Sequence, residues 1–230
     1  MKAVIPSAGE GIRLRPLTLD TPKQLLELHG KPILEHIFDS LPDEIDEIIL
    51  VVGYLGDKIV KHFGTNFKGR KIKYAWQKQK RGTWDALLAA RKHIGKGKFL
   101  MLYGDDIIDK KSIKKLLKHE LAVLAKEVPD PRRFGVVVKD KKGRLLELVE
   151  KPENPKSKLA LTGVKILDER IFRYPAAKHK NGEYYVTDSV SKLARDHAVI
   201  VEEADTWLSI ATPEELARLN EDFKNKKRKA

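Results

Sequence analysis

The segment that decides the fold is AVIPSAGEGIRLRPLT, residues 3–18. Residues 3–6 predict a short buried strand, and a loop with two glycines follows it directly. Gly9 and Gly11 allow the backbone to pass close to a ligand and to point N–H groups at phosphates. The segment therefore predicts a strand of an α/β fold with a ligand site beyond its carboxyl end.

Predicted strands and helices alternate after this segment. The spacing of apolar residues predicts helices at 32–41, 57–63, 83–93 and 111–119. Continuous or alternating apolar runs predict strands at 47–52, 71–76 and 98–103. Repeated strand–helix–strand units are typical of a doubly wound, mostly parallel sheet. Because such sheets bind ligands at the carboxyl ends of their strands, we expect the chemistry in the loops after Pro6 and Tyr103.

The second half of the chain has a more mixed pattern. It predicts a hairpin at 134–138 and 145–149, strands at 161–167 and 199–203, and helices at 187–195 and 213–224. No repeat, low-complexity tract or Pro/Gly-rich linker divides the chain. We therefore predict a single domain at 1–223, with halves at 1–125 and 126–223, and a basic tail at 224–230.

Composition limits the partners and the location of the protein. The 230 residues include no cysteine, which excludes disulfides and thiolate chemistry. No apolar stretch is long enough to cross a bilayer, and the start of the chain lacks the zones of a signal peptide. We therefore predict a cytoplasmic protein with no membrane partner.

The formal net charge of +13 favours anionic partners. Much of the excess lies in lysine-rich segments that are typical of solvated helix and turn faces. A nucleic-acid-binding function would require a recognisable binding module, and the sequence contains none. Nucleic acid is therefore disfavoured as a partner.

The loop after the first strand also carries a cluster of cations. Arg13, Arg15 and Lys23 lie within eleven positions of the chain. Together with glycine amides, they could orient a triphosphate and neutralise its charge, although a glycine-containing surface turn beside a basic patch is the simpler alternative. The Walker pattern is absent, and Leu14 stands where a dinucleotide-binding fingerprint requires its third glycine. The loop therefore indicates a triphosphate site of another type.

Further motifs follow this loop in order along the chain. They are Pro22-Lys23-x-Leu25-Leu26, Gly30-Lys31-Pro32-Ile33-Leu34, Gly82-Thr83, Tyr103-Gly104-Asp105, Glu150-Lys151-Pro152, Thr162-Gly163 and Trp207…Thr212-Pro213-Glu214. With the glycine loop, they closely resemble the signature of sugar-1-phosphate nucleotidylyltransferases, of the glucose-1-phosphate thymidylyl-, uridylyl- and mannose-1-phosphate guanylyltransferase type. The resemblance implies a Rossmann-like, three-layer αβα fold with a mixed, mostly parallel sheet and a small β-rich sugar-binding portion in the second half.

The resemblance implies a nucleotide site in the first half of the chain. Gly9 and Gly11 would hold the nucleotide phosphates, and Ala8 would lie near the base or the ribose. Gln77 and Gly82 would border the base. The alternative for Gln77, an amide at the edge of a strand, has equal weight.

The resemblance also implies catalytic and metal-binding residues. Arg13 and Lys23 would stabilise negative charge on the triphosphate in the transition state. Asp105 would bind a Mg²⁺ ion that bridges phosphate oxygens, and Asp106 could join it through a water molecule. The alternative for Asp105 is a cap on the segment that follows it.

An acceptor site is implied in the second half, at Glu150, Lys151 and Gly163. Lys151 would be the main cation for the sugar phosphate, and Gly163 would allow close approach of the sugar. The partners would be a nucleoside triphosphate and a sugar 1-phosphate, and a homo-oligomer remains open. The sugar phosphate oxygen would attack the α-phosphorus in line and release pyrophosphate. Because a phosphate nucleophile is already ionised at neutral pH, no general base is required.

The sequence departs from the family pattern at a few positions. Ile12 replaces a usual Thr, and Leu161 replaces a usual Asn before Thr162. Ser209 stands where the family has a second metal-binding Asp, and Asp205 is four residues too early to replace it without a register shift. Ser is a poor Mg²⁺ ligand compared with a carboxylate. A second hypothesis is therefore a weak or inactive regulatory paralogue that binds nucleotide sugars.

Overall fold

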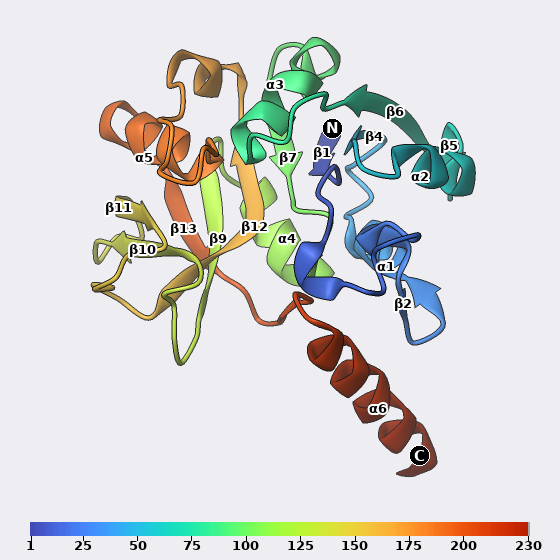
Figure 1. The fold of residues 1–230 in the computed structure, drawn as a ribbon. Helices are drawn as coiled ribbons and strands as arrows, with labels where there is room; N and C mark the ends of the chain where they lie inside the picture. Colours follow the sequence, from blue (N-terminus) through green and yellow to red (C-terminus); the bar gives the residue numbers. More distant parts are fainter. Residues whose placement is uncertain (230) are drawn as a thin grey trace.

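The computed structural model describes the backbone of residues 1–229 and the side chains of residues 1–221. Within these residues, the central feature is a ten-stranded sheet (Figure 1). Its main path runs in the order β11 (Leu145–Glu150), β10 (Gly135–Lys139), β12 (Leu159–Leu167), β7 (Phe99–Met101), β1 (Lys2–Pro6), β4 (Glu47–Val52), β6 (Arg70–Trp76) and β5 (Asn66–Phe67). The two other strands are β9 (Ala122–Glu127), which pairs with β12, and β13 (Ile200–Glu203), which pairs with β9.

The middle of the sheet is parallel. β1 pairs in parallel with β4 and β7, and β4 pairs in parallel with β6. β12 runs antiparallel to β7, and β10 and β11 form the predicted hairpin. The sheet is therefore mixed, with its parallel strands around the first strand of the chain, as the sequence predicted.

Helices cover both faces of the sheet. One face packs against α1 (Ile33–Ser40), α2 (Gly56–Phe63) and α4 (Lys110–Leu117), and the other packs against α3 (Thr83–Ile94) and α5 (Val186–Asp196). In β4, Ile48 and Leu50 belong to the first core, whereas Ile49 and Val51 belong to the second. All four side chains are fully buried, which explains the continuous apolar run of this strand. The predicted three-layer α/β fold is confirmed.

Besides the short strands of two or three residues, two strands of the main sheet differ most from the sequence-based predictions. β9 was not predicted, because a short apolar run does not by itself distinguish a strand from a buried helix. Its pairing with β12 and β13 shows that it is a strand. The strand predicted at 98–103 is shorter, because β7 ends at Met101 and the chain turns at Gly104 and Asp105. The N–H groups of Leu102 and Gly104 still donate to carbonyl oxygens of β1.

Several short elements connect the main ones. They are the strand pairs β2 (Glu27–Leu28) with β3 (Lys31–Pro32) and β8 (Asp106–Ile108) with β14 (Trp207–Ser209), and the 3-10 helices η1 (Ile12–Leu14), η2 (Lys23–Leu25) and η3 (Glu169–Arg173).

The last helix, α6 (Pro213–Lys229), is longer than predicted. The predicted basic tail at 224–230 falls on its final turns, where the side chains and the whole of Ala230 lie outside the described residues. In the described part of the chain, no helix combines the length and the apolar character needed to span a bilayer.

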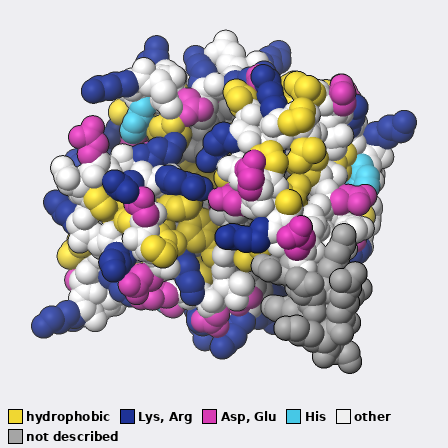
Figure 2. Space-filling view, turned by 60° about the horizontal axis from the view of Figure 1, so that its bottom comes forward, with side chains coloured by type: hydrophobic (Ala, Val, Ile, Leu, Met, Phe, Trp, Pro, Cys, Tyr) yellow, Lys and Arg dark blue, Asp and Glu magenta, His cyan; other side chains and the backbone are white. Residues whose placement is uncertain are grey.

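Charged side chains of both signs are interspersed over the face drawn in Figure 2. Among the described residues, Lys68 contacts both Glu35 and Asp39, and Asp205 contacts two lysines of α4. Lys and Arg side chains also lie around a hollow in the middle of this face. Much of the positive charge is therefore part of a solvated surface with charges of both signs.

The parallel strands bring distant parts of the chain to one edge of the sheet. β1 ends at Pro6, which lies opposite Val51 of β4, and β6 ends at Trp76, which lies opposite Val52. β7 ends at Met101 on the other side of β1. The loops that follow these strands therefore start side by side at the carboxyl edge, where ligands bind in open α/β sheets.

Candidate active site

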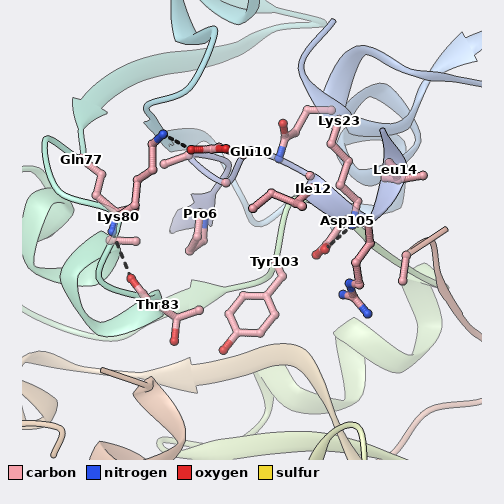
Figure 3. A pocket seen from close by; sticks show the side chains of 18 of the residues that line it. Pro6, Glu10, Ile12, Leu14, Lys23, Gln77, Lys80, Thr83, Tyr103 and Asp105 are labelled. Atoms are coloured by element: carbon pink, nitrogen blue, oxygen red, sulfur yellow. Dashed lines mark hydrogen bonds and ion pairs between the residues drawn. The ribbon is translucent and has the colours of Figure 1, made fainter. Parts of the chain in front are cut away.

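A cavity of about 650 Å³ opens at this edge of the sheet (Figure 3). It is lined by the five residues predicted to bind the nucleotide, Ala8, Gly9, Gly11, Gln77 and Gly82. Arg13, Lys23 and Asp105 line the same cavity. The structure therefore brings together residues that the sequence associated only through separate motifs.

The glycine loop leaves space for a ligand. Gly11 has a φ of 63°, in the left-handed region that favours glycine. Its carbonyl oxygen accepts hydrogen bonds from the Leu14 N–H and the Thr18 hydroxyl, each 2.8 Å long, and these bonds fix the turn into η1. A Cβ atom added at Gly9 would meet no atom within 4 Å, so this glycine borders open space. The loop can therefore let a large group approach its backbone closely.

Lys23 and Asp105 form an ion pair in the wall of the cavity, with 2.6 Å between Nζ and Oδ2 (Figure 3). Lys23 begins η2 and is only 7% exposed. Since an unpaired buried ammonium would be costly, the carboxylate stabilises it there. The Asp105 side chain is 36% exposed, so its oxygens remain accessible to a ligand.

The loop between β6 and α3 forms another wall of the cavity. The Gln77 side chain donates a hydrogen bond of 3.1 Å to the Gly82 carbonyl oxygen, which closes this loop. Gly82 has a φ of 94°, and a Cβ atom there would come within 2.5 Å of the Tyr184 carbonyl oxygen. The Tyr184 carbonyl oxygen also accepts a hydrogen bond of 3.0 Å from the Trp84 backbone N–H. Glycine is therefore required at position 82 for packing against residue 184, in addition to its place in the cavity wall.

A second, smaller cavity of about 210 Å³ adjoins the first. The residues that line both cavities are Arg13, Thr83, Tyr103, Asp105 and Ala211. Of these two cavities, the predicted acceptor residues Glu150, Lys151 and Gly163 line the second and not the first. Arg13 and Asp105 therefore lie at the junction of the predicted nucleotide and acceptor sites.

Glu150 and Lys151 present opposite charges to the second cavity. Glu150 accepts a hydrogen bond from the Thr187 hydroxyl at 2.7 Å, which orients its carboxylate. The Lys151 ammonium lies 3.6 Å from a Glu150 oxygen and 4.9 Å from the centroid of the Tyr185 ring. Half of the Lys151 side chain is exposed, so its charge is available to an anion.

Gly163 makes room for Asp106. A Cβ atom at Gly163 would come within 2.5 Å of Asp106 Oδ2, whereas the Gly163 N–H donates to that oxygen at 3.0 Å. The Trp207 indole N–H donates to Oδ1 at 2.9 Å. Burial and the nearby negative charge of Asp105 raise the pKa of Asp106. Glycine at position 163 therefore lets the backbone approach the buried carboxylate of Asp106. The sequence did not predict this role.

Ser209 lies opposite Asp106 in the β8–β14 pair. Asp205 does not fill the place of the missing carboxylate, because it pairs with Lys111 and Lys115 on α4. Within the described side chains, no group of three or more His, Cys, Asp or Glu residues could hold a metal ion. The accessible carboxylate at the junction is that of Asp105.

Lys165 is a buried cation that contacts residues of the second cavity wall. It is fully buried in β12, and its ammonium lies 4.4 Å from the centroid of the Tyr103 ring. Its hydrogen bonds to the carbonyl oxygens of Thr162 and Gly163 are long, at 3.5 and 3.4 Å. Burial lowers the pKa of Lys165 from 10.5 to about 8, although the charges of two nearby carboxylates oppose this shift.

This shift predicts how stability depends on pH. Between pH 8 and 10.5 the unfolded state binds more protons at Lys165 than the folded state, so stability rises with pH. Relative to Lys165→Met, the unfolding free energy of the wild type should rise by about 3 kcal/mol over this interval. Denaturant unfolding at several pH values measures the difference. Lys61→Met, at an exposed helix position, is the control, and a Lys165→Met curve parallel to the wild type would contradict the shift.

Some residues that line the cavities carry no sequence-based prediction. In the first cavity they include Lys80 and Glu183, and in the second they include Arg133, Tyr185 and Thr187. Tyr185 and Thr187 lie at the start of a predicted helix, a common place for ligand contacts, and this signal could have marked them. No pattern in the sequence singled out Arg133.

Comparisons with known proteins agree with this geometry. The family described as nucleotidyl transferase matches residues 2–226. The chain is 40% identical over 201 residues to the bifunctional protein GlmU of Methanocaldococcus jannaschii, across 86% of the chain and 48% of GlmU. It is 36% identical over 228 residues to UTP–glucose-1-phosphate uridylyltransferase AglF of Haloferax volcanii, across 94% of the chain and 93% of AglF. The chain thus spans about half the length of the GlmU relatives that it matches.

A solved structure shares the fold over nearly the whole chain. It is that of a candidate glucose-1-phosphate thymidylyltransferase from Bacillus anthracis in complex with sucrose, with a TM-score of 0.84 and 28% identity. The match covers 96% of this chain and 94% of the other. The two adjoining cavities, the order of the motifs and these matches together show that the chain belongs to the nucleotidyl transferase family, with sugar-1-phosphate nucleotidylyltransferases among its relatives.

Proposed function

We propose that this protein condenses a nucleoside triphosphate with a sugar 1-phosphate to give a nucleotide sugar and pyrophosphate. The observation that carries the proposal is the junction of the two cavities at Arg13 and Asp105. A group-transfer enzyme must hold two substrates with their reacting atoms in contact. Two cavities that share part of their lining meet this requirement.

In the first cavity, the chain binds and orients the triphosphate. The backbone at Gly9 and Gly11 contacts the phosphates, Ala8 lies near the base or ribose, and Gln77 and Gly82 border the base. These roles are supported by the common cavity and by the open space at Gly9. We propose that residues 1–125 supply most of this nucleotide site.

In the second cavity, Lys151 pairs with the sugar phosphate, Glu150 contacts the sugar, and the backbone at Gly163 borders it. The exposed ammonium of Lys151 and the fixed carboxylate of Glu150 support these roles. We propose that residues 126–223 supply most of this acceptor site.

The transfer needs no base from the protein, because the attacking oxygen belongs to an ionised phosphate. That oxygen forms a bond to the α-phosphorus, and the bond from the α-phosphorus to the bridging oxygen breaks. Pyrophosphate then leaves with the bonding electron pair. Arg13 and Lys23 stabilise the negative charge that develops, because both are basic residues that line the cavity.

The junction fits a Mg²⁺ ion. Mg²⁺ prefers oxygen ligands, keeps several waters, and is commonly held by one or two carboxylates together with substrate phosphates. Asp105 offers such a carboxylate, since its side chain is partly exposed at the junction. When bound, Mg²⁺ would neutralise charge on the phosphate oxygens. Asp105 would hold the ion, and Asp106, the next residue in the chain, is buried beside it.

A pyrophosphate-release assay tests this proposal directly. Purified protein is incubated with Mg²⁺ and every pair drawn from a set of nucleoside triphosphates and a set of hexose 1-phosphates. We expect pyrophosphate and a nucleotide sugar in equal amounts from at least one pair. Ser209 is the observation that favours the second function, a regulatory paralogue. Nucleotide-sugar binding without any pyrophosphate release would support that function and contradict the enzyme.

Ser209→Asp tests whether a second carboxylate is missing. It places a third negative charge beside Asp105 and Asp106, because Ser209 lies opposite Asp106. We expect Mg²⁺ affinity in the presence of nucleotide to rise roughly tenfold, and the melting temperature without Mg²⁺ to fall by several degrees. Ser209→Asn is the control, because asparagine has nearly the shape of aspartate without its charge. Unchanged Mg²⁺ affinity in Ser209→Asp, measured by calorimetry, would place the metal elsewhere.

A further inference from the structure

A carboxylate lies inside the loop that is proposed to bind phosphates. Glu10 stands between the two glycines and lines the nucleotide cavity. It pairs with Lys80, which lines the same cavity from the loop between β6 and α3 (Figure 3). The Glu10 carboxylate also accepts a hydrogen bond of 2.9 Å from the Arg15 guanidinium. One negative charge in the phosphate loop is therefore matched by two cations.

A carboxylate at this position opposes the binding of a triphosphate, because like charges at short distance repel. The ion pairs with Lys80 and Arg15 cancel this repulsion, and they also keep the pKa of Glu10 below its usual value. Glu10 is consequently a negative charge that holds Lys80 at the cavity.

Lys80 is placed to change partner. Its side chain is 57% exposed, so the ammonium has room to move away from Glu10. The ammonium lies 5.4 Å from the centroid of the Tyr54 ring. An exposed ion pair contributes little to stability, so exchange of one anion for another costs little. A triphosphate carries several negative charges and would attract the ammonium more strongly than a single carboxylate does.

We infer that Lys80 is a further triphosphate-binding residue, and that Glu10 holds its ammonium at the mouth of the empty cavity. When the nucleotide binds, the Lys80 ammonium leaves Glu10 and pairs with the phosphate chain. Arg15 remains with Glu10 and limits the repulsion between the carboxylate and the phosphates. The inference rests on the proposed function, since it requires the first cavity to bind a triphosphate.

The alternative is that Lys80 only neutralises Glu10 and never contacts the ligand. The two cases differ when Glu10 is neutral. If Lys80 contacts the phosphates, its loss weakens binding even in a Glu10→Gln background. If Lys80 only screens Glu10, its loss has no effect in that background.

The experiment is a calorimetric titration of the full chain without any sugar phosphate. The probes are UTP and inorganic tripolyphosphate, which carries the phosphate chain without a base. We expect Glu10→Gln to bind both probes about threefold to tenfold more tightly than the wild type, and Lys80→Met to bind them more weakly by a similar factor. The double variant should bind more weakly than Glu10→Gln alone, and these differences should shrink at high salt.

Lys78→Met is the matched control, because Lys78 is exposed in the same loop but does not line the cavity. It should bind both probes like the wild type. Equal affinity of the double variant and Glu10→Gln would overturn the inference while leaving the proposed function intact. Absence of pyrophosphate release with every substrate pair, despite the expected pattern of tripolyphosphate affinities, would overturn the proposed function alone.

Discussion

Lys23→Met should lower kcat/KM for pyrophosphate release by about 10²- to 10³-fold. Lys23 is a buried ammonium at the wall of the nucleotide cavity, and its position is fixed by Asp105 at 2.6 Å. A fixed cation at a site of developing negative charge stabilises the transition state more than a mobile one does. Methionine keeps the length and the apolar stem of lysine, so the change removes mainly the charge.

The measurement is steady-state kinetics at saturating Mg²⁺, together with thermal unfolding to show that the fold persists. Lys61→Met, an exposed change on α2, controls for the loss of one positive charge from the protein. We expect this control to retain wild-type turnover. Near-normal kcat/KM in Lys23→Met would show that the buried cation has no part in the transfer.

Asp105→Asn should reduce turnover by a similar factor of about 10² to 10³, through loss of the metal ligand at the junction. Asn keeps the shape of the side chain but has one neutral oxygen in place of a carboxylate, and Mg²⁺ binds it less well. The change also removes a negative charge that faces the phosphates. Triphosphate affinity without metal should therefore stay equal or increase, whereas affinity with Mg²⁺ should fall.

This opposite response separates a metal ligand from a structural residue, because a misfolded variant would lose both affinities together. Calorimetric titrations of a nucleoside triphosphate with Mg²⁺ and with EDTA measure the two values. Asp43→Asn, at an exposed position, is the control. If Asp105→Asn retained full Mg²⁺-dependent affinity, the metal would have to be held by other groups.

The elements that the sequence predicted well are those with a strong local pattern. The run at 47–52 became β4 with the same bounds, and the helical spacing at 83–93 became α3 with one more residue. β9 has an equally apolar run, but its length is compatible with either a strand or part of a helix. Its assignment depends on pairing with β12 and β13, which lie at distant positions in the chain.

The sequence by itself determined the glycine loop, the order of the motifs and the residue types proposed for chemistry, because each is a local pattern of a few neighbouring residues. Only the tertiary structure decided that Lys23 contacts Asp105, that Glu10 pairs with Lys80, and that the two cavities share a wall. These contacts join loops that follow different strands. They exist because the parallel pairing of those strands brings their carboxyl ends to one edge of the sheet, and strand order is set by packing across the whole chain.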